Sequence, residues 1–506
     1  MAWLAQRELG GRRVSLTGPG VAESSSVWLA IRVADGPRVG HVHLRQDPED
    51  RHGIEGVLAT TETTLSLQLM GKATDLRLGG TMWRALGEVP AGTPRVELDF
   101  AVDSLGQAVR VDGAIVGDRL AATVESAGET FPLDLPMDPN LLVDTGFGTA
   151  SRFPVPAVGE TLRVDSFDPL TMGRGTARIR GVGDEMLDVD GPGGMPAVAT
   201  RVLEVKAAGF DARAWVEPDD GEVVRAETSF GLVLERMATP GVDEVAAADV
   251  AADAAGDLLA LSAIRPLGDR PSRGASRLVV RVGGFDADDA IELPADERQR
   301  PVTEQGPAVW QIEAAQAPDG VDRATAPSPA WLAADPFVQS DHPRMVEAAR
   351  AILAEAGDPE DRWQQAQAIY EWVYTRLDKV PVVGLPSALE VLESRQGDCN
   401  EHTVLYIALA RAIGLPTRIA IGVVWSDELD GFYYHAWPEP WIDGRFVAMD
   451  PTLGQPLADA THLALLHGGI ESWPRLLPYL GRLEIETLEI DRTEIDMPES
   501  EKDAAR

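Results

Sequence analysis

The sequence contains a single cysteine, Cys399, in surroundings that suit nucleophilic chemistry. Asp398 and Glu401 form a D-x-x-E pattern around it, which predicts a capping box and puts Cys399 at the first position of a helix. At such a position the free backbone N–H groups and the helix dipole favour a thiolate and can receive a developing oxyanion. The Asp398 carboxylate opposes the thiolate, so an imidazolium partner would help. Because most free cysteines are small buried apolar residues, the thiol needs such a partner to act as a nucleophile.

His435 and Asp450 are the candidate partners of this thiol. Asp443-Gly444 is a strong signal for a two-residue hairpin turn. With this turn Trp437 faces Asp450, and His435 shares a face with Trp437 because strand side chains alternate. Asp450 is then a diagonal neighbour of His435, about 7–8 Å away by backbone and within side-chain reach. The hairpin therefore predicts a carboxylate that orients an imidazole.

Helices and strands with clear patterns must position these groups. Apolar residues recur at helical spacing after Cys399 until Gly414 and Pro416 stop the helix. Two alternating strands follow, and Pro438 and Pro440 in the second one indicate an edge strand or a bulge that could shift the register. The other predicted elements are helices from about Pro343 and over 364–377 and 387–394, and strands 417–425, 432–442 and 445–450.

The order of a helix-start cysteine, a strand histidine and a next-strand aspartate resembles the transglutaminase-like superfamily. The resemblance extends over roughly Pro343–Thr461 and rests on four segments: Gly397-Asp-Cys399-Asn-Glu401, Ala410-Arg-Ala-Ile-Gly-Leu-Pro-Thr-Arg418, His435-Ala-Trp-Pro-Glu439 and Asp450-Pro-Thr452. It implies a papain-like α/β core with Cys399 as nucleophile, His435 as base and Asp450 as the orienting residue. The family includes crosslinking transglutaminases, peptidases and amidases. Pro440 departs from the β-branched residue often found after the glutamate, so we expect that strand to be distorted beyond Glu439.

The rest of the chain predicts an α+β protein in which antiparallel β-rich domains precede this core. The 506 residues suggest about three domains, and alternating runs with frequent turn residues recur from about Ser24 to Met237. This long β-rich extension more loosely resembles that of a group of bacterial transglutaminase-like proteins, from which no activity follows. The predicted segments are a β-rich N-terminal domain (1–241), an Ala/Asp-rich linker or helix (242–257), a small β unit (258–313), a linker (314–342), the transglutaminase-like core (343–480), and an acidic C-terminal strand and tail (481–506).

The net charge of −36 disfavours nucleic acids and anionic membranes as partners. We interpret this acidity as an adaptation for solubility or habitat, and attraction of basic substrates is the alternative. No apolar stretch reaches the roughly 18 residues of a membrane helix, so we expect no integral membrane segment. The first residues contain no apolar core of signal-peptide length. The sequence thus indicates either a cytosolic protein or one whose targeting segment is missing from it.

A zinc site is the alternative use of the thiol, because Cys399-x-x-His402 together with His435 could supply three ligands. Since the resemblance assigns Cys399 and His435 to thiol chemistry, we expect no metal and no cofactor. His402 is expected on the helix face near the site and Glu401 as a cap. The other histidines have no visible partners in the sequence and are expected on the surface or in the core: His41, His43, His52, His342, His462 and His467.

The predicted function is that of a thiol enzyme that cleaves or transfers an amide acyl group of a protein or peptide through a thioester. Water as the second acceptor would make it a peptidase or amidase, which we favour, and an amine would make it a transamidase. The alternative is a non-catalytic binding or scaffold module that retains the fold. The presence of Cys399, His435 and Asp450 favours the enzyme, because decayed family members often lack one of the three.

Overall fold

The structure is a computed structural model of the 506-residue chain. It describes residues 12–13, 24–33, 36–69, 72–104, 107–137, 141–143, 152–168, 173–188, 197–206, 211–228, 231–237, 263–284, 292–302, 308–319, 327–382, 387–469 and 482–492. These residues form two compact units. The described residues of unit 1 fall within Met1–Leu261 and Val380–Ser394, and those of unit 2 within Ser262–Lys379, Arg395–Gly469 and Arg482–Arg506.

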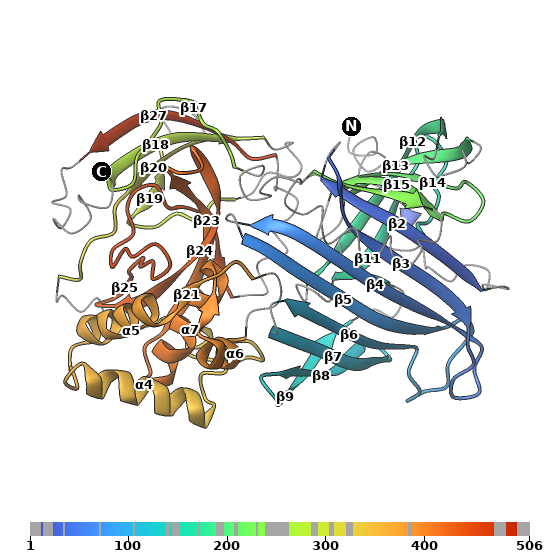
Figure 1. Ribbon diagram of the computed structural model, residues 1–506. Coiled ribbons are helices and arrows are strands. Elements are labelled where there is room, and N and C mark those ends of the chain that lie inside the picture. The colour runs from blue at the N-terminus through green and yellow to red at the C-terminus, as the bar shows by residue number, and fades with distance from the viewer. Residues whose placement is uncertain are drawn as a thin grey trace, which may run out of the picture. The chain divides into compact units, whose positions relative to one another are not determined.

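Unit 1 is built on one large, mainly antiparallel sheet (Figure 1). Strands β2 to β9 pair in chain order, and β16 returns to pair with β2, so that β11–β16 continue the sheet on the other side of β2. Apolar residues from both stretches share one core, among them Leu29, Leu78 and Leu203. The strands are β1 (Arg12–Arg13), β2 (Ser25–Val33), β3 (Arg38–Pro48), β4 (Gly56–Leu69), β5 (Lys72–Ala85), β6 (Val96–Ser104), β7 (Gln107–Val116), β8 (Arg119–Ser126), β9 (Glu129–Pro136), β10 (Leu141–Val143), β11 (Thr161–Asp168), β12 (Gly173–Leu187), β13 (Val198–Lys206), β14 (Asp211–Val216), β15 (Val223–Thr228) and β16 (Leu232–Met237).

This architecture confirms the prediction of a β-rich N-terminal region. In β8, for example, exposed and buried residues alternate without exception, as expected of a strand with one face on a core. The short helix α6 (Ala388–Ser394) also groups with unit 1. The predicted linker or helix at 242–257 lies outside the described residues.

Unit 2 contains two larger sheets and one small one. The described C-terminal strand inserts into the first sheet and pairs antiparallel with β18. The first sheet has the order β17 (Leu267–Gly268), β27 (Glu484–Arg492), β18 (Ala275–Gly283), β20 (Val309–Glu313) and β19 (Gln299–Pro301). The second has the order β25 (Arg445–Phe446), β24 (Gly431–Ile442), β23 (Thr417–Ser426) and β26 (Leu463–Gly468). The small sheet pairs β21 (Asp378–Lys379) with β22 (Gln396–Gly397).

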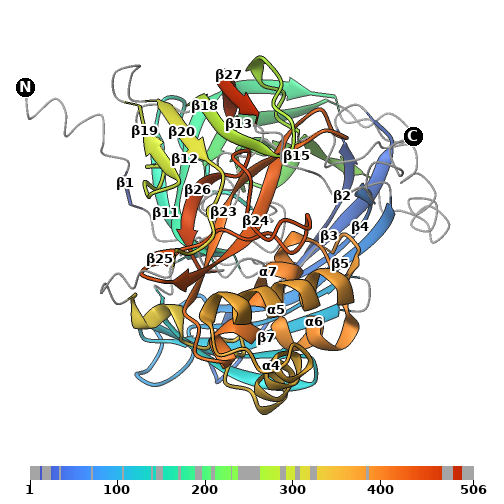
Figure 2. The same cartoon turned by 90° about the vertical axis from the view of Figure 1, so that its left-hand side faces the viewer.

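The helices of unit 2 cover one side of the β23–β24 pair (Figure 2). Helix α7 (Cys399–Ala412) contacts β23 and β24 as well as α4 (Pro343–Glu355) and α5 (Arg362–Arg376). Because it is enclosed from two sides, α7 is buried from Glu401 to Arg411. The remaining element is the 3-10 turn η3 (Pro329–Trp331). In the described residues, mostly antiparallel sheet combined with helices in the C-terminal region confirms the α+β prediction.

The predicted helices and strands of the C-terminal region all form, with bounds that shift by one or two residues at most positions. The third strand is the exception, because it ends at Phe446 instead of Asp450. Among the described residues, no helix has both the length and the apolar character needed to cross a membrane.

Candidate active site

Cys399 is the first residue of α7, as its surrounding pattern predicted. The Asp398 side chain accepts the backbone N–H of Glu401, and Glu401 Oε2 accepts the N–H of Asp398 at 2.9 Å, so both halves of the capping box form. The Asp398 carboxylate also accepts the N–H of Asn400 at 3.0 Å. Gly397 makes this possible, because a Cβ at that position would lie 2.1 Å from the Cβ of Glu401. The cap thereby fixes where the helix starts and where its thiol projects.

The β24–β25 hairpin has the predicted register. Ile442 pairs with Arg445 across a turn in which Asp443 and Gly444 have φ values of 51° and 79°, as a two-residue turn with both central residues left-handed requires. The same register continues past the assigned strand, because the N–H of Met449 donates to the carbonyl of Pro438 at 3.1 Å. Asp450 therefore reaches the predicted diagonal position.

The prolines explain why the third strand is shorter than predicted. The N–H groups of Val447 and Met449 donate to the carbonyls of Pro440 and Pro438. These prolines have no N–H to donate in return, so half of the ladder bonds are missing on this side. The chain from 447 to 449 consequently keeps the register without forming a regular strand.

His435 and Asp450 are in direct contact, with His435 Nε2 2.7 Å from Asp450 Oδ2. Both side chains are buried, at 1% and 0% exposure. Asp450 Oδ1 accepts the N–H groups of Thr452 and Leu453 at 2.8 and 2.9 Å. Burial alone would raise the pKa of Asp450, but its charge interaction and hydrogen bond with His435 and its hydrogen bond with His462 hold this pKa well below its usual range.

The other ring nitrogen, His435 Nδ1, is buried and has no hydrogen-bond partner among the described residues. The next residue, Ala436, touches the start of α7 twice. Its carbonyl accepts the Thr403 hydroxyl at 3.1 Å, and its backbone hydrogen-bonds to the thiol of Cys399. These bonds hold the strand segment of His435 against the thiol, with one imidazole nitrogen bound to Asp450 and the other available.

The electrostatic surroundings of the thiol differ from those expected from its helix position. Burial raises the pKa of Cys399 well above its ordinary value, and the Asp398 carboxylate raises it further. The hydrogen bond with the Ala436 backbone acts in the opposite direction. The sequence pattern indicates a lowered pKa, whereas in the structure the surroundings of Cys399 raise the pKa of the thiol.

His462 is the main site residue that the sequence did not indicate. It is fully buried, and its Nε2 lies 3.0 Å from Asp450 Oδ2, the same oxygen that contacts His435. Its Nδ1 lies 3.2 Å from Asp459 Oδ1. The only available signal was that these histidine and aspartate side chains follow Asp450 within a short loop.

A buried ion pair between Arg418 and Glu439 joins β23 to β24 near the strand segment of His435. Arg418 and Glu439 face each other across the two strands, with Arg418 Nε 2.7 Å from Glu439 Oε2. The indole of Trp437 donates to the other oxygen of Glu439 at 3.2 Å. Burial alone would raise the pKa of Glu439, yet the charges of Arg418, His467 and Arg298 lower it to about 2. Two residues of the motifs therefore form a buried ion pair that supports the strand carrying His435.

Two groups of side chains in the described residues have the spacing of metal ligands: His435 with Asp450 and His462, and Asp296 with Glu439 and His467. In the first group direct hydrogen bonds to one Asp450 oxygen already join the two imidazoles. The proposed zinc set of Cys399, His402 and His435 is not among these groups. His402 instead bonds through Nδ1 to the carbonyl of Asp398 at 2.7 Å.

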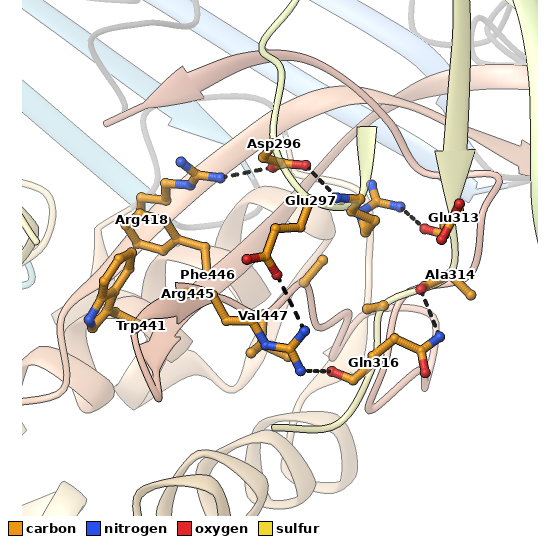
Figure 3. Close-up of a pocket in the computed structure, with 14 residues that line it drawn as sticks. Asp296, Glu297, Glu313, Ala314, Gln316, Arg418, Trp441, Arg445, Phe446 and Val447 are labelled. Atoms are coloured by element: carbon orange, nitrogen blue, oxygen red, sulfur yellow. Dashed lines mark hydrogen bonds and ion pairs between the residues drawn. The ribbon is translucent and has the colours of Figure 1, made fainter. Parts of the chain in front are cut away.

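A pocket of about 260 Å³ opens elsewhere in unit 2, next to the β24–β25 turn (Figure 3). Figure 3 shows that its charged side chains are engaged with one another or with backbone carbonyls. Arg418 pairs with Asp296 at 3.4 Å and Arg445 with Glu297 at 3.5 Å, while Arg298 donates to carbonyl oxygens. None of Cys399, His435 and Asp450 lines this pocket.

Comparisons with known proteins agree with the motif pattern. Residues 347–451 match the family model described as Transglutaminase-like superfamily. Among solved structures, a protein from Cytophaga hutchinsonii described as "a Putative Cysteine Protease" is 15% identical, with a TM-score of 0.26, over 46% of this chain and 88% of that chain. A similarity at that TM-score carries no argument about this protein. No significant match was found among curated proteins. The segment 347–451 is therefore a domain of the transglutaminase-like superfamily.

Proposed function

We propose that the protein is a thiol enzyme that transfers the acyl group of a protein or peptide amide through a thioester on Cys399. The observation that carries the proposal is the state of His435. One ring nitrogen is bound by Asp450 at 2.7 Å, and the other is buried and unpartnered beside the strand segment that contacts the thiol. A neutral imidazole held in this way can accept a proton only through Nδ1.

In the first half-reaction His435 Nδ1 takes the proton of Cys399 as the sulfur attacks the amide carbonyl carbon. The backbone N–H of Cys399, at the positive end of α7, is the proposed donor to the resulting oxyanion. The tetrahedral intermediate collapses when Nδ1 returns the proton to the amide nitrogen. The C–N bond breaks, the amine leaves, and the acyl group remains on sulfur as a thioester.

In the second half-reaction water or an amine loses a proton to His435 and attacks the thioester carbonyl, and the C–S bond breaks. The returning proton regenerates the thiol. Hydrolysis and transamidation share every residue named so far, so both remain within the proposal.

The test uses the full chain and a panel of fluorogenic peptide amides, glutamine donors and cell-wall amides, with product detection by mass spectrometry. We expect turnover of at least one amide and an acyl adduct on Cys399 at early time points. Cys399→Ala and His435→Ala should abolish both signals. If folded protein turns over no amide and traps no acyl group on Cys399, the non-catalytic alternative, a binding or scaffold module, replaces the enzyme.

A further inference from the structure

His462 lies between two carboxylates in the interior of unit 2. Its Nε2 is 3.0 Å from Asp450 Oδ2, and its Nδ1 is 3.2 Å from Asp459 Oδ1. All three side chains are at most 5% exposed. A carboxylate only accepts hydrogen bonds, so each ring nitrogen must carry a proton to bond with its neighbour. With both carboxyl groups ionised, this geometry fits an imidazolium.

Asp459 is fixed as an acceptor by groups other than His462. Its Oδ2 accepts the N–H of Gly274 at 2.8 Å and the side-chain amide of Gln455 at 2.8 Å. Its Oδ1 accepts both the N–H and the hydroxyl of Thr461, at 2.9 and 2.6 Å. Burial alone would raise the pKa of Asp459, but these bonds and the bond from His462 hold it well below its ordinary value. The carboxylate therefore stays ionised and holds a proton on Nδ1.

The other groups that face His462 do not offset this arrangement. The rings of His435 and Trp437 lie 6.0 and 5.1 Å away, both edge-on. The guanidinium of Arg298 approaches the backbone carbonyl of His462, and is itself held by the carbonyl of Asp459. Burial would lower the pKa of His462, yet the hydrogen bonds and charges of Asp450 and Asp459 raise it above its ordinary value.

We propose that His462 is a positioning residue, a buried imidazolium that fixes Asp450 and weakens the charge interaction of this carboxylate with His435. The proposal rests on the proposed thiol function. Asp450 Oδ2 contacts both imidazoles, so the positive charge of His462 offsets the carboxylate charge that faces His435. The raised pKa of Cys399 agrees with a site in which the thiol is not ionised in advance. Proton transfer to His435 is deferred until the thiol attacks.

The test compares the wild type with His462→Gln, because the glutamine amide keeps an N–H donor near Asp450 without the charge. The readout is the rate of Cys399 alkylation by iodoacetamide as a function of pH, which needs no substrate. We expect the midpoint of this curve to fall by about one pH unit or more in His462→Gln, because the unshielded Asp450 favours a thiolate–imidazolium pair. Because unfolding would expose the thiol and also lower the midpoint, circular dichroism and thermal unfolding must first show that His462→Gln is folded like the wild type.

Two further measurements distinguish a failure of the proposed thiol function from a failure of the role proposed for His462. His435→Ala should change the alkylation curve. If it does not, the imidazole is not coupled to the thiol, and both the proposed function and the role of His462 fail. If His435→Ala changes the curve and folded His462→Gln does not, only the role of His462 is overturned. If His462→Gln does not fold, nitrogen-15 NMR of the wild type with labelled histidines still tests the proposal, because it reports the protonation of His462 directly. Two protons on His462 at pH 7 support the proposal, and one proton overturns it.

Discussion

Four donors converge on the carboxylate of Asp450, two imidazoles on one oxygen and two backbone N–H groups on the other. A carboxylate held at both oxygens cannot rotate towards a substrate. Together with its low pKa, this arrangement suits a residue that orients His435, and it does not suit a nucleophile or a general acid. In the proposed reaction, the thiol and the unpartnered nitrogen of His435 are then the groups left to react.

Asp450→Asn should fold but lose roughly a thousandfold or more in turnover, because an amide can present the wrong group to His435 and carries no charge. Cys399→Ala should lose more, and the double variant little more than Cys399→Ala, since such residues act as a unit. Steady-state rates on the best amide of the panel measure this. Asp341→Asn, the same change at an exposed aspartate, is the control. Near-normal activity of Asp450→Asn would mean that another side chain orients His435.

At the scale of elements, the site depends on where α7 begins and on how β23 and β24 are joined. The capping box sets the start of α7, and the Arg418–Glu439 pair joins β23 to β24. The capping box and the Arg418–Glu439 pair each involve only two neighbouring segments. Each can therefore be disrupted by a substitution that leaves Cys399, His435 and Asp450 unchanged.

Gly397→Ala should destabilise the start of α7 by about 0.5–2 kcal/mol, the value of an N-cap. The added Cβ would meet the side chain of Glu401, which must move and release the N–H of Asp398. Hydrogen exchange of the peptide that spans residues 395–405 should accelerate. In the control Gly283→Ala the new Cβ meets only the end of a glutamate at 3.9 Å, and no acceleration is expected. Unchanged exchange in Gly397→Ala would show that the cap does not depend on this glycine.

The Arg418–Glu439 pair should make the protein sensitive to acid. The folded pKa of Glu439 is about 2, below its ordinary value of 4.5, so its contribution is complete above about pH 4.5 and is lost as the pH falls towards 2. The shift corresponds to about 3 kcal/mol. Urea unfolding should show Glu439→Gln less stable by about this amount at pH 7, with a smaller further loss at pH 3 than the wild type.

The control for this prediction is Glu313→Gln, which removes one partner of the exposed pair with Arg300. An exposed pair contributes at most about 1 kcal/mol, so its pH dependence should match the wild type. Equal losses at pH 7 in Glu439→Gln and Glu313→Gln would show that the buried pair has no special role.

At the scale of the whole molecule, the chain forms two compact units whose sequences interleave. The predicted junction at 314–329 is anchored at its start. Ala315 donates to the carbonyl of Ala458 at 2.8 Å, and Arg445 holds the carbonyl of Ala317 at 2.7 Å. The predicted domain boundaries otherwise remain predictions.

We predict that limited proteolysis cuts first at the Ala/Asp-rich segment 242–257, the other junction expected from the sequence, and only later near 314–319, where hydrogen bonds hold the chain. Mass spectrometry of the fragments would locate the cuts. The predicted product is a β-rich fragment that ends near residue 241. A first cut at 314–319, or resistance of the chain everywhere except its ends, would contradict this order.

The cap of Cys399 and the contact of His435 with Asp450 were predictable because each is encoded over a short stretch of chain. The D-x-x-E pattern acts over one helical turn, and a two-residue turn sets the register of the strands that meet at it. The remaining helices and strands of the C-terminal region were predictable from the spacing of their apolar residues, which is also a local pattern. The expected distortion of the second strand beyond Glu439 was wrong, because β24 continues to Ile442 without a register shift. The irregularity falls instead on the partner segment after Phe446.

The sequence could not predict the role of His462 or the raised pKa of Cys399. His462 acquires its two carboxylates only when the loop after Asp450 folds back, and Asp459 is fixed by the N–H of Gly274, 185 residues earlier in the chain. The pKa of the thiol follows from burial by segments that meet only in the folded unit. Local periodicity carries no information about such distant neighbours. The sequence by itself thus predicted which groups could react, and the tertiary structure decided the direction in which the pKa values of Cys399 and Asp450 shift, because desolvation and charge pairing depend on what surrounds a group in space.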